Sequence, residues 1–138
     1  LQGREQLWQS IPVPGGGVWV DMGGGTGSNL DYFGSEVDSL KNIYVVDLSG
    51  SLLEVARARV AERGWTNVQV AEADATTFRP ASGTADVVTF SYSLTMIPDW
   101  FAAIENACQM LRPGGLIGVV DFYVSRKFPH ADHRRHPW

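Results

Sequence analysis

Glycine recurs at close spacing directly after a short apolar run near the beginning of the sequence. The run Val18–Asp21 has the character of a buried strand that ends in an acidic residue. Four glycines follow it within six residues: Gly23, Gly24, Gly25 and Gly27. Because glycine has no β-carbon, a turn built from it lets the backbone approach a nucleotide closely. The segment therefore indicates a nucleotide-binding turn, and a purely structural loop is the alternative.

The spacing of the acid and the glycines distinguishes between nucleotide cofactors. The pattern is Asp21-x-Gly23-x-Gly25-x-Gly27, whereas the third glycine of a dinucleotide turn, G-x-G-x-x-G, would fall on Ser28. A pyrophosphate requires a helix N-terminus without a carboxylate nearby. S-adenosylmethionine has no phosphate and carries a sulfonium and an ammonium, which Asp21 would attract. The pattern therefore favours S-adenosylmethionine over a dinucleotide.

Two further acidic residues follow apolar runs in register with the glycine turn. Asp47 ends the run Ile43–Asp47, and a carboxylate at that point can accept two hydrogen bonds from a ribose diol. The alternative for Asp47 is the capping of a helix that begins near Ser49. Asp74 follows the run Val68–Ala71 and can accept a hydrogen bond from the exocyclic amine of adenine. Together the two acids predict contacts to both parts of an adenosine.

The elements that must position these residues alternate along the chain. Apolar, β-rich runs alternate with stretches of helical periodicity, which predicts an α/β domain with a mostly parallel sheet. We expect strands at 18–21, 43–47, 68–71, 86–92 and 116–123, and helices at 4–11, 27–33, 51–63 and 98–111.

Local signals set the ends of the expected helices. Ser51 and Glu54 have the spacing of a capping box, and Gly64 suits a helix C-terminus. Pro98 suits the first turn of the last helix. Its expected apolar stripe is formed by Phe101, Ile104, Cys108 and Leu111, so we expect Cys108 in the core.

Composition narrows the class of protein. A length of 138 residues with 44% hydrophobic residues is enough for one domain with a core, which we assign to residues 1–138. A net charge of −4 disfavours general nucleic-acid binding. The single cysteine excludes an internal disulfide, and no apolar run approaches the roughly 20 residues of a membrane span. With no signal peptide visible, we expect a cytoplasmic protein.

The set of motifs resembles the class I S-adenosylmethionine-dependent methyltransferases. The glycine pattern, Asp47, Asp74, Ala-Asp-Val-Val at 85–88 and Leu-Arg-Pro-Gly-Gly at 111–115 carry this resemblance. It implies a Rossmann-like, doubly wound, mostly parallel sheet, with the cofactor across the ends of the first three strands and the acceptor near the fourth. We assign cofactor binding to Asp21, Gly23, Gly25, Gly27, Asp47, Leu48, Asp74, Ala75 and Ser91.

Three segments have a narrower resemblance. Residues 18–30, 90–100 and 118–127 resemble the methyltransferase part of betaine lipid synthases, which trimethylate the amino group of diacylglyceryl-homoserine. This resemblance implies an N-methyltransferase acting on an aminolipid, with S-adenosylhomocysteine as product. A methyltransferase acting on a soluble small molecule and a cofactor-binding module without catalysis are the alternatives.

Charge at the end of the sequence bears on a lipid acceptor. Residues 126–138 hold four basic residues and one acidic residue, a local charge of +3, which leaves −7 for the rest. The resemblance gives this basic segment a use in peripheral contact with an anionic membrane surface. A solvated terminus is the alternative.

The end of the fourth expected strand supplies the candidates for the acceptor side of the site. The segment Ser91-Tyr92-Ser93 lacks the Asn/Asp-Pro-Pro-aromatic motif of nucleic-acid amino-methyltransferases, so we do not expect a base amine as acceptor. Direct transfer to an amine needs a base only to keep that amine neutral. Tyr92 and Tyr123 are our candidates for this catalytic role. Asp121 is a further candidate, and packing or structural roles are the alternatives for these residues.

The histidines and the end of the sequence indicate what we expect the domain to lack. The histidines at 130, 133 and 136 lack neighbouring Cys or Glu motifs, so we expect no metal site. The family fold has an antiparallel hairpin after the fifth strand, whereas this sequence ends roughly 15 residues beyond that strand. We therefore expect a sheet truncated after strand five, whose edge is covered by the remainder of a longer chain or by a second copy.

Overall fold

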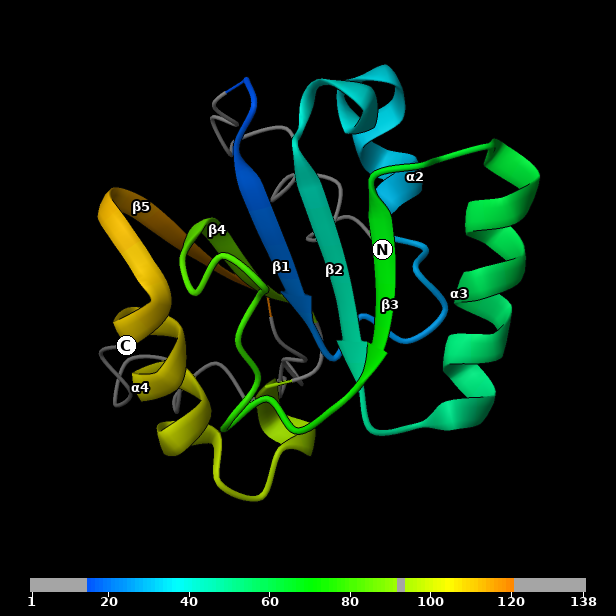
Figure 1. Ribbon diagram of the computed structural model, residues 1–138. Helices are drawn as coiled ribbons and strands as arrows, with labels where there is room; N and C mark the ends of the chain where they lie inside the picture. Colours follow the sequence, from blue (N-terminus) through cyan, green and yellow to red (C-terminus); the bar gives the residue numbers. More distant parts are fainter. Residues whose placement is uncertain (1–14, 92–93, 121–138) are drawn as a thin grey trace, which may run out of the picture.

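Five strands form one parallel sheet in residues 15–91 and 94–120, the part of the chain that the computed structural model describes (Figure 1). The strands are β1 (Val18–Met22), β2 (Asn42–Asp47), β3 (Val68–Glu72), β4 (Ala85–Ser91) and β5 (Leu111–Val120). Their order is β3-β2-β1-β4-β5, and every neighbouring pair is parallel. The strand order reverses direction between β1 and β4, which is the position where doubly wound sheets leave a crevice at their carboxyl ends. The predicted fold class is confirmed.

Both faces of the sheet are covered, so its central strands are apolar on both sides. Helix α2 (Leu30–Phe33), the 3-10 helix η1 (Gly34–Ser39) and helix α3 (Gly50–Arg63) bury the face that carries Trp19. Helix α4 (Trp100–Met110) buries the face that carries Val20 and Met22. All five residues of β1 are buried, which holds the glycine turn at its end on a rigid support.

The helices after β1 and β2 begin at other residues than the sequence predicted. Helix α2 begins at Leu30 rather than at residue 27, because the glycines before it adopt positive φ angles that no α-helix contains. Helix α3 is capped by Ser49, whose hydroxyl accepts the N–H of Leu52, so the predicted capping box at Ser51 and Glu54 is wrong. Gly64 ends α3 at a φ of 69°, as predicted.

Helix α4 presents a face to the sheet that matches the predicted stripe only in part, because Ile104 and Leu111 pack against the core as predicted, whereas Phe101 and Cys108 do not. Its buried residues are Ala103, Asn106, Ala107 and Met110. Cys108 is exposed, which contradicts its predicted place in the core, and Phe101 is 67% exposed. The alanines explain this choice because small side chains let a helix pack closely against a sheet.

The ends of α4 and β5 also differ from expectation. Asp99 is the N-cap of α4, so Pro98 precedes the helix instead of forming its first turn. β5 begins at Leu111 rather than at residue 116, with a shift of register opposite Ala85 and Val87. The 3-10 helix η2 (Leu94–Met96) lies between β4 and α4.

Some expectations fall beyond these elements. The predicted helix at 4–11 and the predicted end of the last strand at 121–123 lie outside the described residues. In the described part, β5 pairs with β4 alone, so the expected covering of its other edge stays a prediction. Among the helices of residues 15–91 and 94–120, none has the length and apolarity to cross a membrane.

Candidate functional site

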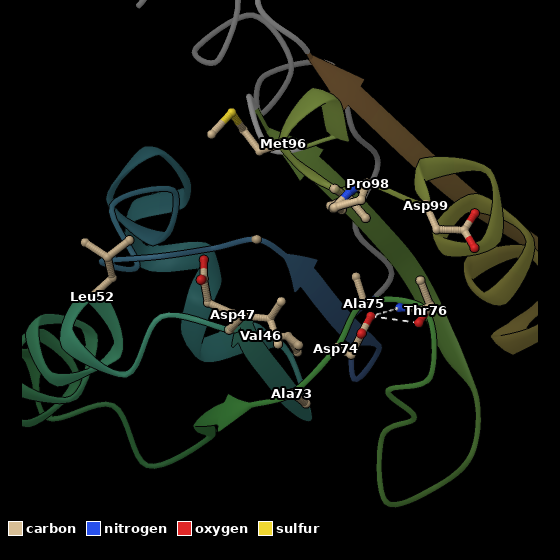
Figure 2. A pocket seen from close by; sticks show the side chains of 13 residues that line it. Val46, Asp47, Leu52, Ala73, Asp74, Ala75, Thr76, Met96, Pro98 and Asp99 are labelled. Carbon is tan, nitrogen blue, oxygen red and sulfur yellow. Dashed lines mark hydrogen bonds between the residues drawn. The ribbon is translucent and has the colours of Figure 1, made fainter.

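A cavity of about 660 Å³ lies at the carboxyl ends of the parallel strands (Figure 2). One side is formed by Gly23, residues 46–48 and Leu52, which belong to the glycine turn, the end of β2 and the start of α3. The other sides are formed by residues 73–76 after β3 and residues 96–99 before α4. The cavity therefore lies where a doubly wound sheet is expected to bind a ligand.

The glycine turn has both the conformation and the space that only glycine tolerates. Three of its residues adopt positive φ angles between 54° and 73°: Gly23, Gly25 and Gly27. Gly24 donates its N–H to the carbonyl of Val46 at 3.0 Å. A β-carbon on Gly24 would lie 2.8 Å from Cγ1 of Val45 and 2.9 Å from Oδ2 of Asp21. The turn therefore lies directly against β2 and against the buried acid of β1.

Asp47 joins the glycine turn to the start of α3 and also lines the cavity. Its Oδ2 accepts the N–H of Gly25 at 2.9 Å, and its Oδ1 accepts the N–H of Ser49 at 2.9 Å. Each carboxylate oxygen can accept a further hydrogen bond. The alternative role for Asp47 was to cap helix α3, but the N-cap of α3 is Ser49, whose hydroxyl accepts the N–H of Leu52. Asp47 therefore has acceptor capacity left for a ligand.

Asp74 is held in a tight local turn at the opposite side of the cavity. Its Oδ1 accepts both the N–H of Thr76 at 2.8 Å and the Thr76 hydroxyl at 2.7 Å. These two hydrogen bonds hold the pKa of the Asp74 carboxyl below its usual value, because they favour the charged form. No donor in the described residues reaches Oδ2, so this oxygen can accept a hydrogen bond from a ligand.

Asp21 lies beneath the glycine turn and not among the lining residues of the cavity. It is fully buried, and its Oδ2 accepts the Asn29 amide N–H at 2.9 Å. Its Oδ1 accepts the Thr89 hydroxyl at 2.8 Å, and that hydroxyl accepts Nε1–H of Trp19 at 2.8 Å. Asp21 therefore anchors β1, β4 and the turn to one another and supports the cavity without lining it.

The other described candidates differ in their relation to the cavity. Leu48 and Ala75 line it, and Leu48 is 68% exposed. Gly27 shapes the turn where it packs on Ala56 of α3, 3.5 Å from the position a β-carbon would take. Ser91 ends β4 and is buried, and in the described part of the chain its hydroxyl has no hydrogen-bond partner.

The candidates on the acceptor side cannot be located in the same way. Tyr92, Tyr123 and Asp121 lie outside the described residues, and so do the histidines at 130, 133 and 136. Within the described ranges, no group of three or more His, Cys, Asp or Glu could hold a metal ion.

The segment before α4 is the part of the site that the sequence reasoning missed. Met96, Ile97, Pro98 and Asp99 all line the cavity. The prediction assigned Pro98 to a helix, although an Asp directly after a Pro and before an apolar stripe is also the signature of an N-cap. Thr76 was missed too, and Asp-x-Thr is a recognisable turn signal.

The lining residues carry charge of one sign. Within residues 15–91 and 94–120, three of the lining residues are carboxylates, Asp47, Asp74 and Asp99, and none is Lys, Arg or His. A ligand with phosphates would meet repulsion here, whereas a cation would be attracted.

Comparison with known proteins places the chain in a family. The family described as "Methyltransferase domain" matches residues 20–115. The ubiquinone/menaquinone biosynthesis C-methyltransferase UbiE of Ectopseudomonas mendocina is 31% identical over 127 residues, which cover 87% of this chain and 49% of the relative. UbiE of Idiomarina loihiensis is 28% identical over 126 residues, which cover 87% and 50%. The chain thus spans about half the length of the curated relatives it matches.

Solved structures share the fold. The YcgJ protein from Bacillus subtilis matches with a TM-score of 0.78 at 20% identity, over 88% of this chain and 51% of that one. An S-adenosylmethionine-dependent methyltransferase from Geobacter sulfurreducens, in complex with S-adenosylhomocysteine, matches with a TM-score of 0.68 at 23% identity, over 84% and 46%. None of these relatives is named as a betaine lipid synthase, so the narrower resemblance stays a prediction. Because the family match covers well over half of the sequence, the chain belongs to the methyltransferase domain family.

Proposed function

We propose that this domain binds S-adenosylmethionine in the cavity and transfers its methyl group to an acceptor that enters beside residues 94–99. The observation that carries the proposal is the charge of the cavity wall, because the described residues that line it include three carboxylates and no basic side chain. S-adenosylmethionine is the nucleoside cofactor whose charge fits this wall, because it carries a sulfonium and an ammonium instead of phosphates.

The donor and acceptor atoms of the cavity fit the parts of the cofactor. Asp47 keeps acceptor capacity on both oxygens for the ribose diol, while Gly25 and Ser49 hold the carboxylate in place. Asp74 keeps Oδ2 for the exocyclic amine of adenine. Leu48 offers an apolar surface to the base. Ser91 is not among the lining residues, but its buried hydroxyl has no hydrogen-bond partner in the described part of the chain, and buried polar atoms are nearly always hydrogen-bonded, so we assign it to a polar group of the ligand.

The chemistry follows from position and exclusion of water. When bound, S-adenosylmethionine supplies an electrophilic methyl group on sulfur. The task of the protein is to hold the acceptor atom in line with that methyl at roughly 3 Å, which provides most of the rate enhancement in such a transfer. The glycine turn gives the room for close approach, and Asp21 anchors the turn from below. We assign Tyr92 and Tyr123 the task of keeping an acceptor amine neutral.

We propose the amino group of a diacylglyceryl-homoserine type lipid as the acceptor. The support is the resemblance of residues 18–30, 90–100 and 118–127 to betaine lipid synthases. The basic segment 126–138 would then contact the anionic membrane surface. A second candidate is a carbon acceptor, because the UbiE relatives are named as C-methyltransferases of ubiquinone and menaquinone biosynthesis. A soluble small molecule is the third.

Methyl transfer from labelled S-adenosylmethionine distinguishes these acceptors. The full chain is incubated with vesicles that contain the aminolipid, with soluble amines, and with a phenolic carbon acceptor, and the label is followed in each product. Label in the lipid headgroup alone supports the aminolipid proposal, and label only in the soluble amine or at carbon overturns it. Asp47→Ala serves as the matched control and should lose transfer to every acceptor. Cofactor binding without any transfer would favour the binding module that lacks catalysis.

A further inference from the structure

One buried amide connects helix α4 to the turn that carries Asp74. Asn106 is only 6% exposed, although it lies in the middle of a helix that packs against an apolar sheet face. Its Nδ2 donates to the carbonyl oxygens of Ala75 and Phe78, both at 3.0 Å. A single side chain on α4 thus binds the backbone of the 75–78 segment at two points.

The orientation of this amide is determined by its partners. Oδ1 of Asn106 accepts Nε–H of Arg79 at 2.9 Å, and Arg79 also donates from Nη2 to Oε1 of Gln109 at 3.0 Å. Because a guanidinium only donates and a carbonyl only accepts, the amide nitrogen must face the two carbonyls. Both N–H groups of the Asn106 amide are therefore used to hold the backbone of residues 75–78 in one place.

The segment that Asn106 holds behaves as one unit with Asp74. The Asp74 carbonyl accepts the N–H groups of Thr77 at 3.1 Å and Phe78 at 2.9 Å, while its carboxylate accepts from Thr76. The turn is therefore closed internally, and the bonds to Asn106 determine where it lies relative to α4. Residues 96–99, directly before the same helix, form another wall of the cavity (Figure 2).

We infer that Asn106 is a positioning residue that fixes the Asp74 carboxylate for recognition of the adenine amine. The inference rests on the proposed function, because it assumes that adenine binds at Asp74. Asn106 acts through the backbone of the turn and does not line the cavity itself. Its loss should therefore change which base the site prefers, in addition to any effect on folding.

The test compares two ligands that differ at the amine. S-adenosylhomocysteine carries the exocyclic amine, and S-inosylhomocysteine carries a carbonyl oxygen in its place, which cannot donate to Asp74. Calorimetry on the full chain should show a preference of about 10- to 100-fold for the adenosyl ligand, the range expected for a hydrogen bond to a charged acceptor. In Asn106→Leu the preference should fall below about 3-fold.

The chain contains a matched control for this variant. Asn67 uses the same chemistry away from the cavity, with Nδ2 donating to the carbonyls of Val37 at 2.8 Å and Leu40 at 3.0 Å. Asn67→Leu should lower the melting temperature in the same way and leave the ligand preference unchanged. If Asn67→Leu reduced the preference as much as Asn106→Leu does, the effect would be general destabilisation and the inference would be overturned.

A milder variant covers the case in which Asn106→Leu does not fold. Arg79→Met removes the hydrogen bond that orients the amide, and because Arg79 is exposed the variant should fold and show a partly reduced preference. A wild-type preference retained in Arg79→Met, or in a folded Asn106→Leu, overturns the inference and leaves the proposed function standing. A wild-type chain that binds neither ligand, or both equally, overturns the inference together with the adenine site.

Discussion

The glycine turn leads to a sharp prediction for Gly24→Ala. Gly24 has no positive φ angle, so the substitution introduces no backbone strain, and its effect comes from space alone. The new β-carbon would lie 2.8 Å from Cγ1 of Val45 and 2.9 Å from Oδ2 of Asp21. Both neighbours are fully buried, and the Asp21 carboxylate is held by Asn29 and Thr89, so neither can move away easily.

The expected magnitude is that of overpacking a core. Inserting one carbon into a well-packed site typically costs about 1–3 kcal/mol. For a domain of this size, that loss corresponds to a decrease in melting temperature of roughly 3–10 °C. Because the turn must shift away from β2, its hydrogen bond from Gly24 to Val46 should weaken and cofactor affinity should fall as well.

Thermal unfolding followed by circular dichroism checks the prediction, with Gly15→Ala as the control. Among the described residues, no atom lies within 4 Å of the position a β-carbon would take at Gly15, and its φ angle is outside the left-handed region. Gly15→Ala should therefore be neutral or stabilise the chain slightly, by up to about 1 kcal/mol. If Gly24→Ala melted at the temperature of Gly15→Ala and bound the cofactor equally well, the packing argument for the turn would be refuted.

Two further predictions concern hydrogen bonds near the cavity. Thr89→Val keeps the shape of the side chain but removes the hydrogen bonds to Trp19 and Asp21. Urea unfolding should show that the free energy of unfolding falls by about 2–4 kcal/mol. A fall below about 0.5 kcal/mol would contradict the stabilising role of these hydrogen bonds. Because Thr76 lowers the pKa of Asp74, this carboxyl stays ionised well below neutral pH, and protonation should remove its contribution only in acid. The affinity ratio of wild type to Asp74→Asn should therefore stay constant between about pH 5 and about pH 8, and a step in that ratio near neutral pH would be evidence against the assignment.

The sequence was sufficient for the sheet and for the main acids of the cavity. Strand-ending acids such as Asp47 and Asp74 could be predicted because parallel strands end at one edge, whatever the exact packing of the helices. The glycine turn could be predicted because the positive φ angles at Gly23, Gly25 and Gly27 need glycine at those positions, whatever packs around the turn. These signals lie in short stretches of sequence, so they can be identified without knowledge of the tertiary structure.

What the sequence could not predict depends on tertiary packing. The buried face of α4 was assigned to Phe101 and Cys108, whereas the sheet accepts Ala103 and Ala107 because they allow close approach. The role of Asn106 was invisible for the same reason, since its carbonyl partners lie about 30 residues earlier in the sequence. The cavity wall at 96–99 was missed because the last helix was predicted to begin at Pro98, whereas Asp99 is its N-cap. Sequence signals rarely locate a helix end to within one residue.

Calorimetric titration with S-adenosylmethionine tests the central claim most directly, using the wild-type chain, Asp47→Ala and Asp38→Ala. Asp38 is an exposed acid on η1, away from the cavity, and serves as the charge-matched control. The wild type and Asp38→Ala should bind the cofactor with equal affinity. Asp47→Ala should bind about 100-fold more weakly or worse, because two hydrogen bonds to a charged acceptor are lost. No binding by the wild type, or unchanged affinity in Asp47→Ala, would contradict the account.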